Sequence, residues 1–271
     1  MSVVWKYPNF LVIGSSRSGT TSLYHHLGEH PEAYVTPRLE PRFFAFENDP
    51  LRYGGPGDEI LRERVVTDAS AYQALFAHTR GQRAVGEVAP AYLSSATAPA
   101  AIRRYTPQAK LIAILRNPVE RAISSFRLQR MEGLEPAAML AAAWDLEAVR
   151  AREGWSYVWL YTYRGLYYTH LRRYRDLFPA EQMKVLLYED WAAEGGRELL
   201  REVFRFLDLD EAYLPERTVR LNSTTGMLDA DGSACAVSDE CRALLVRYYR
   251  EEIDRLEELI DRDLSAWRSQ P

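Results

Sequence analysis

One stretch near the N-terminus, "FLVIGSSRSGTTSLYHHL" (residues 10–27), constrains the fold more than any other part of the chain. Four apolar residues lead into Gly14, Gly19 follows after four more residues, and Leu23 and Leu27 then lie one helical turn apart. This order predicts a strand, a glycine loop and a helix. Because backbone N–H groups and the positive end of a helix dipole converge in such loops, the pattern predicts a phosphate-binding site.

Short apolar runs alternate with helical patterns along the chain, which is typical of a mainly parallel sheet covered by helices. Strands are predicted at residues 10–13, 83–88, 110–115 and 183–189, each followed by a helix candidate. A long last helix is predicted to begin at Ser238 and to carry apolar residues as far as Leu264. We therefore expect an α/β fold with a central, mainly parallel sheet flanked by helices, in a single domain over residues 1–271.

The composition disfavours several classes of protein. The formal net charge of -4 gives no general reason to expect nucleic acid as a partner. No apolar run reaches the length of about 18 residues that a membrane span needs, and the N-terminus lacks the pattern of a signal peptide, which favours the cytoplasm. Cys235 and Cys241 are too few for a disulfide framework and are interpreted as thiols, with a local bridge as the alternative.

The glycine loop differs from that of ATP-binding proteins. Their motif is G-x-x-x-x-G-K-[ST], whereas Thr20 follows Gly19 here. Thr20 and Thr21 offer hydroxyl groups to an anion, and Arg17 places a permanent cation in the loop. The missing lysine argues against ATP. The alternative is a plain strand-to-helix turn.

A second anion site is predicted in "LIAILRNPVERAISSF". Arg116 follows a predicted strand at the end where parallel sheets bind ligands, and Ser124 comes eight residues later on the next helix. An arginine fork and a hydroxyl group can clamp a phosphate. The alternative is a surface arginine paired with Glu120. Two anion sites on one sheet suit a nucleotide that is phosphorylated at both ends.

On these motifs the sequence resembles the sulfotransferases that use 3′-phosphoadenosine 5′-phosphosulfate (PAPS), and above all the glycosaminoglycan (heparan sulfate) branch with its bacterial relatives. "HPEAYVTPRLEPRFF", "GEVAPAYL", "RRYRDLFPAEQMKVLLYEDW" and "RLNSTTG" extend the similarity over nearly the whole chain. The resemblance implies that PAPS is the sulfuryl donor, with no metal required. It implies that the loop residues Arg17, Ser18, Gly19, Thr20 and Thr21 hold the 5′-phosphosulfate, and that Arg116 and Ser124 hold the 3′-phosphate.

The resemblance also implies a general base. In the glycosaminoglycan branch a glutamate just before a Phe-Phe pair takes the proton of the acceptor hydroxyl, and Glu40 in "LEPRFF" matches it. The alternative is a loop carboxylate paired with Arg38 or Arg42. Arg17 stands where many relatives have lysine, and since a guanidinium does not lose its proton under ordinary conditions, its expected role is electrostatic.

The nucleotide cover is expected to involve three further residues. Tyr188 resembles the tyrosine that cytosolic relatives place beside adenine, although a half-buried strand tyrosine is the alternative. Thr225 and Gly226, in "RLNSTTG", resemble the segment that closes over the nucleotide. The Lys-Gly-Arg that follows in several relatives has no clear counterpart.

In "GEVAPAYL" Val88 stands where several eukaryotic relatives have lysine. Glu87 is interpreted equally as a residue that orients the loop or meets the acceptor and as a structural carboxylate.

Two other features are open to more than one interpretation. His25, His26 and His30 have helical spacing but no acidic or thiol partners nearby, so a helix surface is favoured over a metal site. "WSYVWLYTYRGLYY" (residues 155–168) suits core packing and an acceptor groove equally.

The sequence favours an enzyme that transfers a sulfuryl group from PAPS to a hydroxyl of a carbohydrate, lipid or natural-product acceptor. A small-molecule P-loop kinase and a nucleotide-binding protein without catalysis are the alternatives. Neither the acceptor nor the oligomeric state can be identified from the sequence.

Overall fold

A computed structural model describes residues 6–193, 196–215 and 237–269. Its contacts divide the chain into two compact units. The first unit comprises Met1–Asp49, Arg64–Arg116 and Arg172–Asn222, and the second comprises Pro50–Glu63, Asn117–Leu171 and Ser223–Pro271. The prediction of a single domain stays a prediction.

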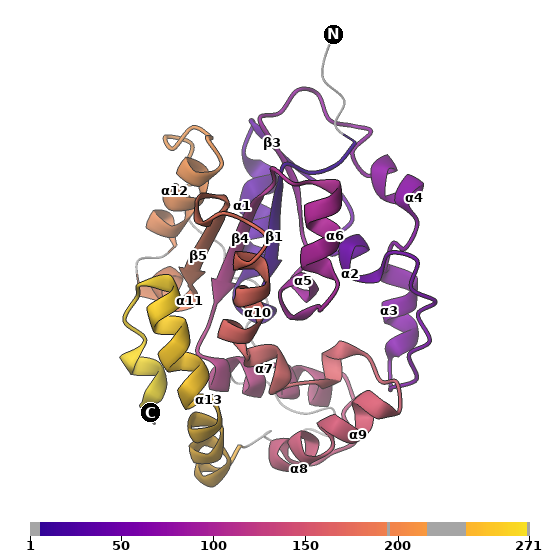
Figure 1. Cartoon of the computed structure of the whole chain (residues 1–271), viewed down its shortest axis with the longest axis vertical. Helices are drawn as coiled ribbons and strands as arrows, with labels where there is room; N and C mark the ends of the chain where they lie inside the picture. The colour runs from indigo at the N-terminus through magenta and orange to yellow at the C-terminus, as the bar shows by residue number, and fades with distance from the viewer. Residues whose placement is uncertain (1–5, 194–195, 216–236, 270–271) are drawn as a thin grey trace. The chain divides into compact units, whose positions relative to one another are not determined.

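The first unit contains a five-stranded sheet in the order β2-β3-β1-β4-β5. The strands are β1 (Phe10–Gly14), β2 (Ala33–Val35), β3 (Ala84–Val88), β4 (Lys110–Leu115) and β5 (Met183–Leu187), and neighbouring strands are parallel throughout. Figure 1 shows β1, β3, β4 and β5 side by side in the middle of this unit. Because the strands are parallel, all five carboxyl ends lie at one edge of the sheet.

The helices of the first unit follow from the same alternating pattern. They are α1 (Thr20–Glu29), α2 (Phe43–Phe46), α4 (Ala69–Ala74), α5 (Ala91–Ser94), α6 (Ala98–Tyr105), α11 (Tyr188–Ala193) and α12 (Arg197–Phe206), with the 3₁₀ turn η3 (Ala180–Gln182). Helix α10 (Tyr167–Arg175) begins in the second unit and ends in the first.

Alternation along the strands separates two faces of the sheet. On one face Val12, Val88 and Ile112 pack in an apolar cluster with residues of α1 and α12, such as Leu27 and Phe204. Leu11 and Glu87, which pair across β1 and β3, belong to the opposite face. Figure 1 shows α5 and α6 beside β1. The sheet is therefore covered on both faces, as a parallel sheet requires.

The second unit is helical. Its helices are α3 (Asp58–Arg64), whose last residue belongs to the first unit, α7 (Pro118–Met131), α8 (Leu140–Asp145), α9 (Glu147–Arg152) and α13 (Asp239–Ile260). It also contains the 3₁₀ turns η1 (Tyr157–Trp159), η2 (Tyr163–Gly165) and η4 (Ser265–Arg268). The predicted start of the last helix is confirmed, since Ser238 Oγ accepts a hydrogen bond from Cys241 N at 3.2 Å. The Asn117 side chain caps α7 in the same way and accepts from Val119 N at 3.0 Å.

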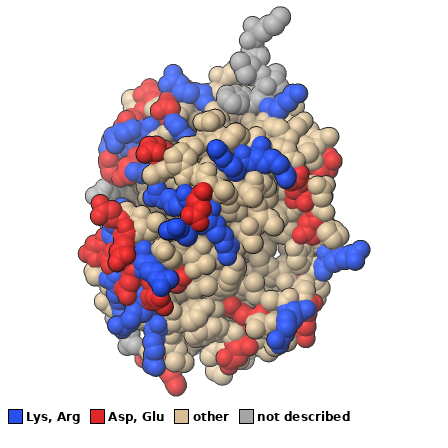
Figure 2. Space-filling view, in the orientation of Figure 1, with Lys and Arg blue, Asp and Glu red and all other residues tan. Residues whose placement is uncertain are grey.

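Charged side chains on the surface of the first unit are interspersed rather than separated by sign. Figure 2 shows acidic and basic side chains mixed over α12. Ion pairs account for this mixture: Arg205 pairs with Glu211 at 2.7 Å and Lys184 with Glu202 at 2.6 Å. No extended field of one sign results on α12. Among the described residues, no helix has both the length and the apolar character needed to cross a membrane.

The four predicted strands are confirmed. Two strands and the last helix differ from what was expected. Strand β5 ends at Leu187, so Tyr188 begins α11 and is not a strand tyrosine. Strand β2 was not predicted, because only three residues pair and two of them are half-buried. Helix α13 ends at Ile260, where Asp261 takes a left-handed φ of 51°, so Leu264 lies beyond the helix.

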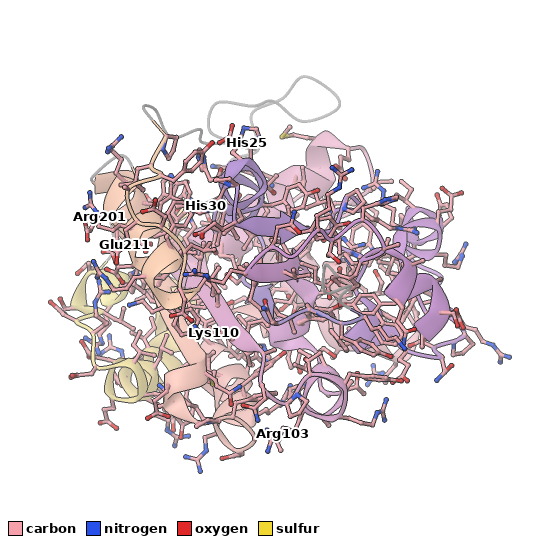
Figure 3. The ribbon with its side chains drawn as sticks, turned by 90° about the horizontal axis from the view of Figure 1, so that it is seen from above. His25, His30, Arg103, Lys110, Arg201 and Glu211 are labelled. Carbon is pink, nitrogen blue, oxygen red and sulfur yellow. The ribbon has the colours of Figure 1, made fainter. Side chains whose placement is uncertain are left out.

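The interpretation of the histidines as surface residues is wrong for two of the three. His25 is exposed, but His26 and His30 are only 2% and 1% exposed. The expectation of no acidic partner nearby is also wrong, because His25 and His26 each lie 3.3 Å from the Glu29 carboxylate. The His26 ring stacks on Trp191 at 5.9 Å, and His30 Nε2 lies 3.2 Å from the carbonyl oxygen of Asp210. Figure 3 places His30 inside this part of the unit and His25 nearer its rim. Within the described residues no group of three or more His, Cys, Asp or Glu could hold a metal ion.

Candidate active site

The loop between β1 and α1 is fixed by short contacts at both ends. Ser15 N donates to the carbonyl oxygen of Ile114 at 2.7 Å, and the hydroxyl groups of Ser15 and Ser18 lie 2.6 Å apart in the interior. Gly19 precedes the helix with φ 87° and offers no side chain that could cap it. The first amides of α1 have no partners within the helix, so the loop has the geometry that binds anions.

Arg116 joins this loop to the end of β5. Its Nη1 donates to the carbonyl oxygen of Arg17 at 3.3 Å, and its guanidinium carbon lies 5.0 Å from the centre of the Tyr188 ring. A Cβ atom added to Gly19 would lie 3.4 Å from the same ring. The structure thus brings together residues from three separate segments at the carboxyl edge of the sheet. Arg116 and Tyr188 are both half-buried.

The segment that follows β2 carries Glu40. The Glu40 side chain is 25% exposed, and its carboxylate forms an ion pair with Arg42. Glu40 and Arg42 both take left-handed backbone conformations, with φ values of 54° and 59°. A left-handed conformation costs a residue other than glycine on the order of 1 kcal/mol or more, so the surrounding structure must hold this segment in place. The base role of Glu40 stays a prediction.

A buried carboxyl group, that of Glu87, lies on β3. Strand β1 separates β3 from β4, the strand that Arg116 follows. Glu87 is fully buried, and its Oε1 accepts hydrogen bonds from Tyr72 at 2.7 Å and from Tyr92 at 2.6 Å. Its Oε2 has no hydrogen-bond partner among the described residues. Burial raises the pKa of Glu87 to about 7, although the hydrogen bonds from Tyr92 and Tyr72 lower it in part. This carboxyl group therefore changes charge near neutral pH.

A pH-dependent stability follows from Glu87. In the unfolded chain its pKa returns to about 4.5, so between that pH and about 7 the folded state holds a proton that the unfolded state has lost. Raising the pH through this window should therefore lower the free energy of unfolding, by on the order of 3 kcal/mol.

Glu87→Gln is the matched variant, because its amide oxygen can still accept from both tyrosines but does not titrate. Urea unfolding of the two proteins from pH 4.5 to pH 8 measures the difference. Parallel curves for wild type and variant would contradict the raised pKa.

Sequence reasoning missed the two tyrosines around Glu87. Tyr92 lies in the quoted motif "GEVAPAYL", but Tyr72 lies on α4 in a pattern that resembles any amphipathic helix. No pattern in the sequence predicts the hydrogen bond between Tyr72 and Glu87. Both hydroxyl groups have pKa values raised well above the ordinary value, first because they are buried and then because they lie beside Glu87.

The remaining predicted residues have different fates. Ser124 is buried on α7, in the second unit. Glu120, the alternative partner proposed for Arg116, forms an ion pair with Arg242. Thr225, Gly226 and Cys235 lie outside the described residues, while Cys241 is a buried free thiol.

The aromatic segment at residues 155–168 is in large part core. Trp159, Tyr161 and Tyr167 are at most 1% exposed. Arg150 and Glu135 form a buried ion pair at 2.6 Å, and the Tyr161 hydroxyl group donates to the same carboxylate at 2.7 Å. Packing accounts for these three residues.

Comparison with known proteins agrees with the fold. The sequence profile described as "Sulfotransferase family" matches residues 8–213, which include all five strands and the loop after β1. The chain belongs to the sulfotransferase family. The resemblance inferred from the motifs is confirmed at this level.

Two curated relatives of this sulfotransferase-family chain are heparan sulfate enzymes by name. The heparan sulfate glucosamine 3-O-sulfotransferase 6 of Homo sapiens is 30% identical over 71% of this chain and 51% of its own length. The bifunctional heparan sulfate N-deacetylase/N-sulfotransferase 1 of Xenopus tropicalis is 25% identical over 97% of this chain and 31% of its own length. The chain thus spans about half or less of these relatives.

A solved structure is more similar over its whole length. The crystal structure of a sulfotransferase from Alicyclobacillus acidocaldarius is 34% identical, with a TM-score of 0.86, and the match covers 97% of this chain and 99% of that one. The family and the α/β fold with a parallel sheet are therefore shared.

Proposed function

We propose that the protein transfers a sulfuryl group from PAPS to a hydroxyl group of an acceptor molecule. The observation that supports this most is the position of Arg116, which contacts both the glycine loop through Arg17 and the ring of Tyr188. A donor with an aromatic base between two anionic ends needs N–H groups, a guanidinium fork and an aromatic surface within one site. The carboxyl edge of the sheet offers all three.

The donor-binding residues would divide the work as follows. The first amides of α1, with Ser18, Thr20 and Thr21, would hold the phosphosulfate end, where helix geometry favours an anion. Arg116 would meet the 3′-phosphate, and Tyr188 would lie beside the adenine. Ser124 stays a predicted 3′-phosphate contact, and Thr225 and Gly226 stay predicted nucleotide contacts.

Transfer itself would depend on Glu40 and Arg17. Glu40 would take the proton of the acceptor hydroxyl group while the oxygen of that hydroxyl group forms a bond to sulfur. The bond between sulfur and the 5′-phosphate oxygen breaks at the same centre, and the electron pair leaves with the phosphate. Arg17 and the loop amides would stabilise the charge that develops there, without a change in their own protonation.

A carbohydrate is the acceptor class that the relatives favour. Both curated relatives are named for heparan sulfate, and the 3-O-sulfotransferase of Homo sapiens is the one whose name indicates a sugar hydroxyl. Val88 is 1% exposed and packs in the apolar cluster of the sheet, so this position supplies no cation for an anionic polymer. On the names of the relatives we propose a carbohydrate hydroxyl as the first acceptor to test, with lipid and natural-product hydroxyls next. The apolar Val88 adds no support for a highly anionic polymer.

Donor binding is tested with adenosine 3′,5′-bisphosphate (PAP), the desulfated product of PAPS. Gly19→Ala should weaken PAP binding by about tenfold or more, because the new methyl group would occupy space beside the Tyr188 ring, where the nucleotide is proposed to lie. Gly81→Ala is the matched control: Gly81 has φ 86°, against 87° for Gly19, and open space around it. Both variants should lose about 1 kcal/mol of stability to the left-handed backbone, but only Gly19→Ala should lose affinity.

Calorimetry without added metal measures PAP affinity, and urea unfolding measures stability. Transfer is measured with ³⁵S-labelled PAPS and heparan sulfate, followed by lipid and phenol acceptors. Magnesium-dependent consumption of ATP with no PAP binding would replace the proposal by a small-molecule kinase. Tight PAP binding without transfer to any acceptor or to water would leave a nucleotide-binding protein.

A further inference from the structure

The segment that carries Glu40 is tied to the buried Glu87 by a chain of two hydrogen bonds. The backbone N–H of Phe44 donates to Tyr92 Oη at 3.3 Å, and Tyr92 Oη donates to Glu87 Oε1 at 2.6 Å. Phe44 is the second residue of α2, which follows directly after "EPR". These two hydrogen bonds therefore connect Glu87 on strand β3 to the start of the helix that follows Glu40.

Helix α2 needs such a partner. The first amides of any helix lack partners within it, and α2 has no side-chain cap, because Arg42 stands at the N-cap position. The Tyr92 hydroxyl group acts as the missing cap from a neighbouring element. It can do so because the Tyr92 hydroxyl group donates its hydrogen bond to Glu87, which leaves an oxygen lone pair to accept from the Phe44 amide.

The backbone around Glu40 also needs external support. Glu40 and Arg42 are both left-handed residues on either side of Pro41, and such conformations persist only where neighbouring contacts fix them. The structure provides two such contacts: Val66 N donates to the Pro41 carbonyl oxygen at 2.9 Å, and Phe44 N donates to Tyr92. Without the second, the start of α2 loses a hydrogen bond that fixes its backbone at Phe44, four residues after Glu40.

We propose that Glu87 and Tyr92 are positioning residues that hold the Glu40 segment in the conformation required for proton transfer. The inference rests on the proposed function, in which Glu40 is the base. Neither residue needs to touch donor or acceptor. Their effect passes through the backbone of α2, and a small displacement of a base costs turnover rather than donor binding.

Tyr72 provides a matched control within the same site. Its hydroxyl group donates to the same Glu87 oxygen at 2.7 Å and is also fully buried. Among the described residues Tyr72 contacts α2 through its ring, which stacks on Phe43, and not through its hydroxyl group, so Tyr72→Phe keeps that contact. The titratable groups facing Glu87 are Tyr72 from α4 and Tyr92 from α5, with the Tyr7 and Tyr174 hydroxyl groups beside these two. Burial raises the pKa values of Tyr72, Tyr92 and Tyr174 well above the ordinary value, whereas that of Glu87 is raised to about 7. Glu87 is therefore the group among these four that changes charge near neutral pH.

The experiment compares Tyr92→Phe, Tyr72→Phe and Glu87→Gln with the wild type. Tyr92→Phe should lower kcat by about 10- to 100-fold with PAP affinity unchanged, and Tyr72→Phe should lower it by less than about threefold. Glu87→Gln keeps an acceptor oxygen for the Tyr92 hydroxyl group, so it should lower kcat less than Tyr92→Phe does. Hydrogen exchange of the Phe44 amide should be at least about tenfold faster in Tyr92→Phe alone.

The outcomes separate this inference from the proposed function. If the wild type transfers no sulfuryl group to any acceptor or to water, the proposed function fails, and the exchange rate of the Phe44 amide still decides whether Tyr92 holds α2. If the wild type turns over and Tyr92→Phe matches Tyr72→Phe in kcat and in exchange, the positioning role is wrong. Equal loss of PAP affinity and of kcat in Tyr92→Phe would also overturn it, because that pattern indicates general damage to the fold.

Discussion

Glu40→Gln is expected to lower kcat by about 10²- to 10⁴-fold while the affinity for PAP stays within about twofold. Glutamine keeps the size of the side chain and its acceptor oxygen, but the amide does not accept a proton at neutral pH. Donor binding should be spared, because it is assigned to the glycine loop, Arg116 and Tyr188. Rapid-quench transfer from ³⁵S-labelled PAPS, with calorimetry of PAP in parallel, separates the two quantities.

Glu47→Gln is the control for this substitution. Glu47 closes α2, three residues after Phe44, and its carboxylate contacts Arg104 and Tyr105 as that of Glu40 contacts Arg42. It therefore tests the loss of an ion-paired glutamate without the loss of the proposed base, and turnover should be unchanged. Undiminished turnover in Glu40→Gln would leave the Arg42 ion pair as the whole role of Glu40.

Arg116→Ala is expected to weaken PAP binding by about 100- to 1,000-fold. The substitution would remove a guanidinium that reaches the loop carbonyl of Arg17 and lies over the Tyr188 ring, so the two donor-binding segments would lose their common contact. The loss should appear in the dissociation constant and in the KM for PAPS. At saturating PAPS, kcat should change far less, because Glu40 and Arg17 remain.

Arg103→Ala is the matched control for the arginine. Arg103 also donates to a carbonyl oxygen, that of Pro107 at 2.9 Å, and also lies over an aromatic ring, that of Phe178 at 5.9 Å. It lies in the last turn of α6, before Lys110 begins β4, and Figure 3 labels it at the rim of the view. Equal affinity loss in both variants would show that arginine stacking in general, and not the Arg116 site, governs binding.

The amount of the candidate site that could be predicted differs from residue to residue. The loop residues were found because Gly14 and Gly19 have the spacing of a phosphate-binding loop between a strand and a helix. Arg116 was found because it directly follows a buried apolar strand. Tyr188 was found by resemblance, but its place at the start of α11 was not, since nothing in "LLYED" marks where the strand ends.

Burial of polar groups was the poorest prediction. His30 was interpreted as a surface residue, yet it contacts Asp210, 180 positions further along the chain. Glu87 was interpreted as either functional or structural, and the choice depends on Tyr72 and Tyr92, which other elements supply. Such contacts are long-range, and a local pattern of apolar residues carries no information about them.

The sequence by itself determined the order of strands, loop and helices, since the period of apolar residues and the positions of glycine act over a few residues. It also determined the family, because the loop and the Arg116 segment are contiguous motifs. Only the tertiary structure decided that Arg116 touches Arg17 and Tyr188, and that Tyr92 links Glu87 to the segment of Glu40. The physical reason is that parallel strands gather their carboxyl ends at one edge, so residues far apart in the sequence become neighbours there.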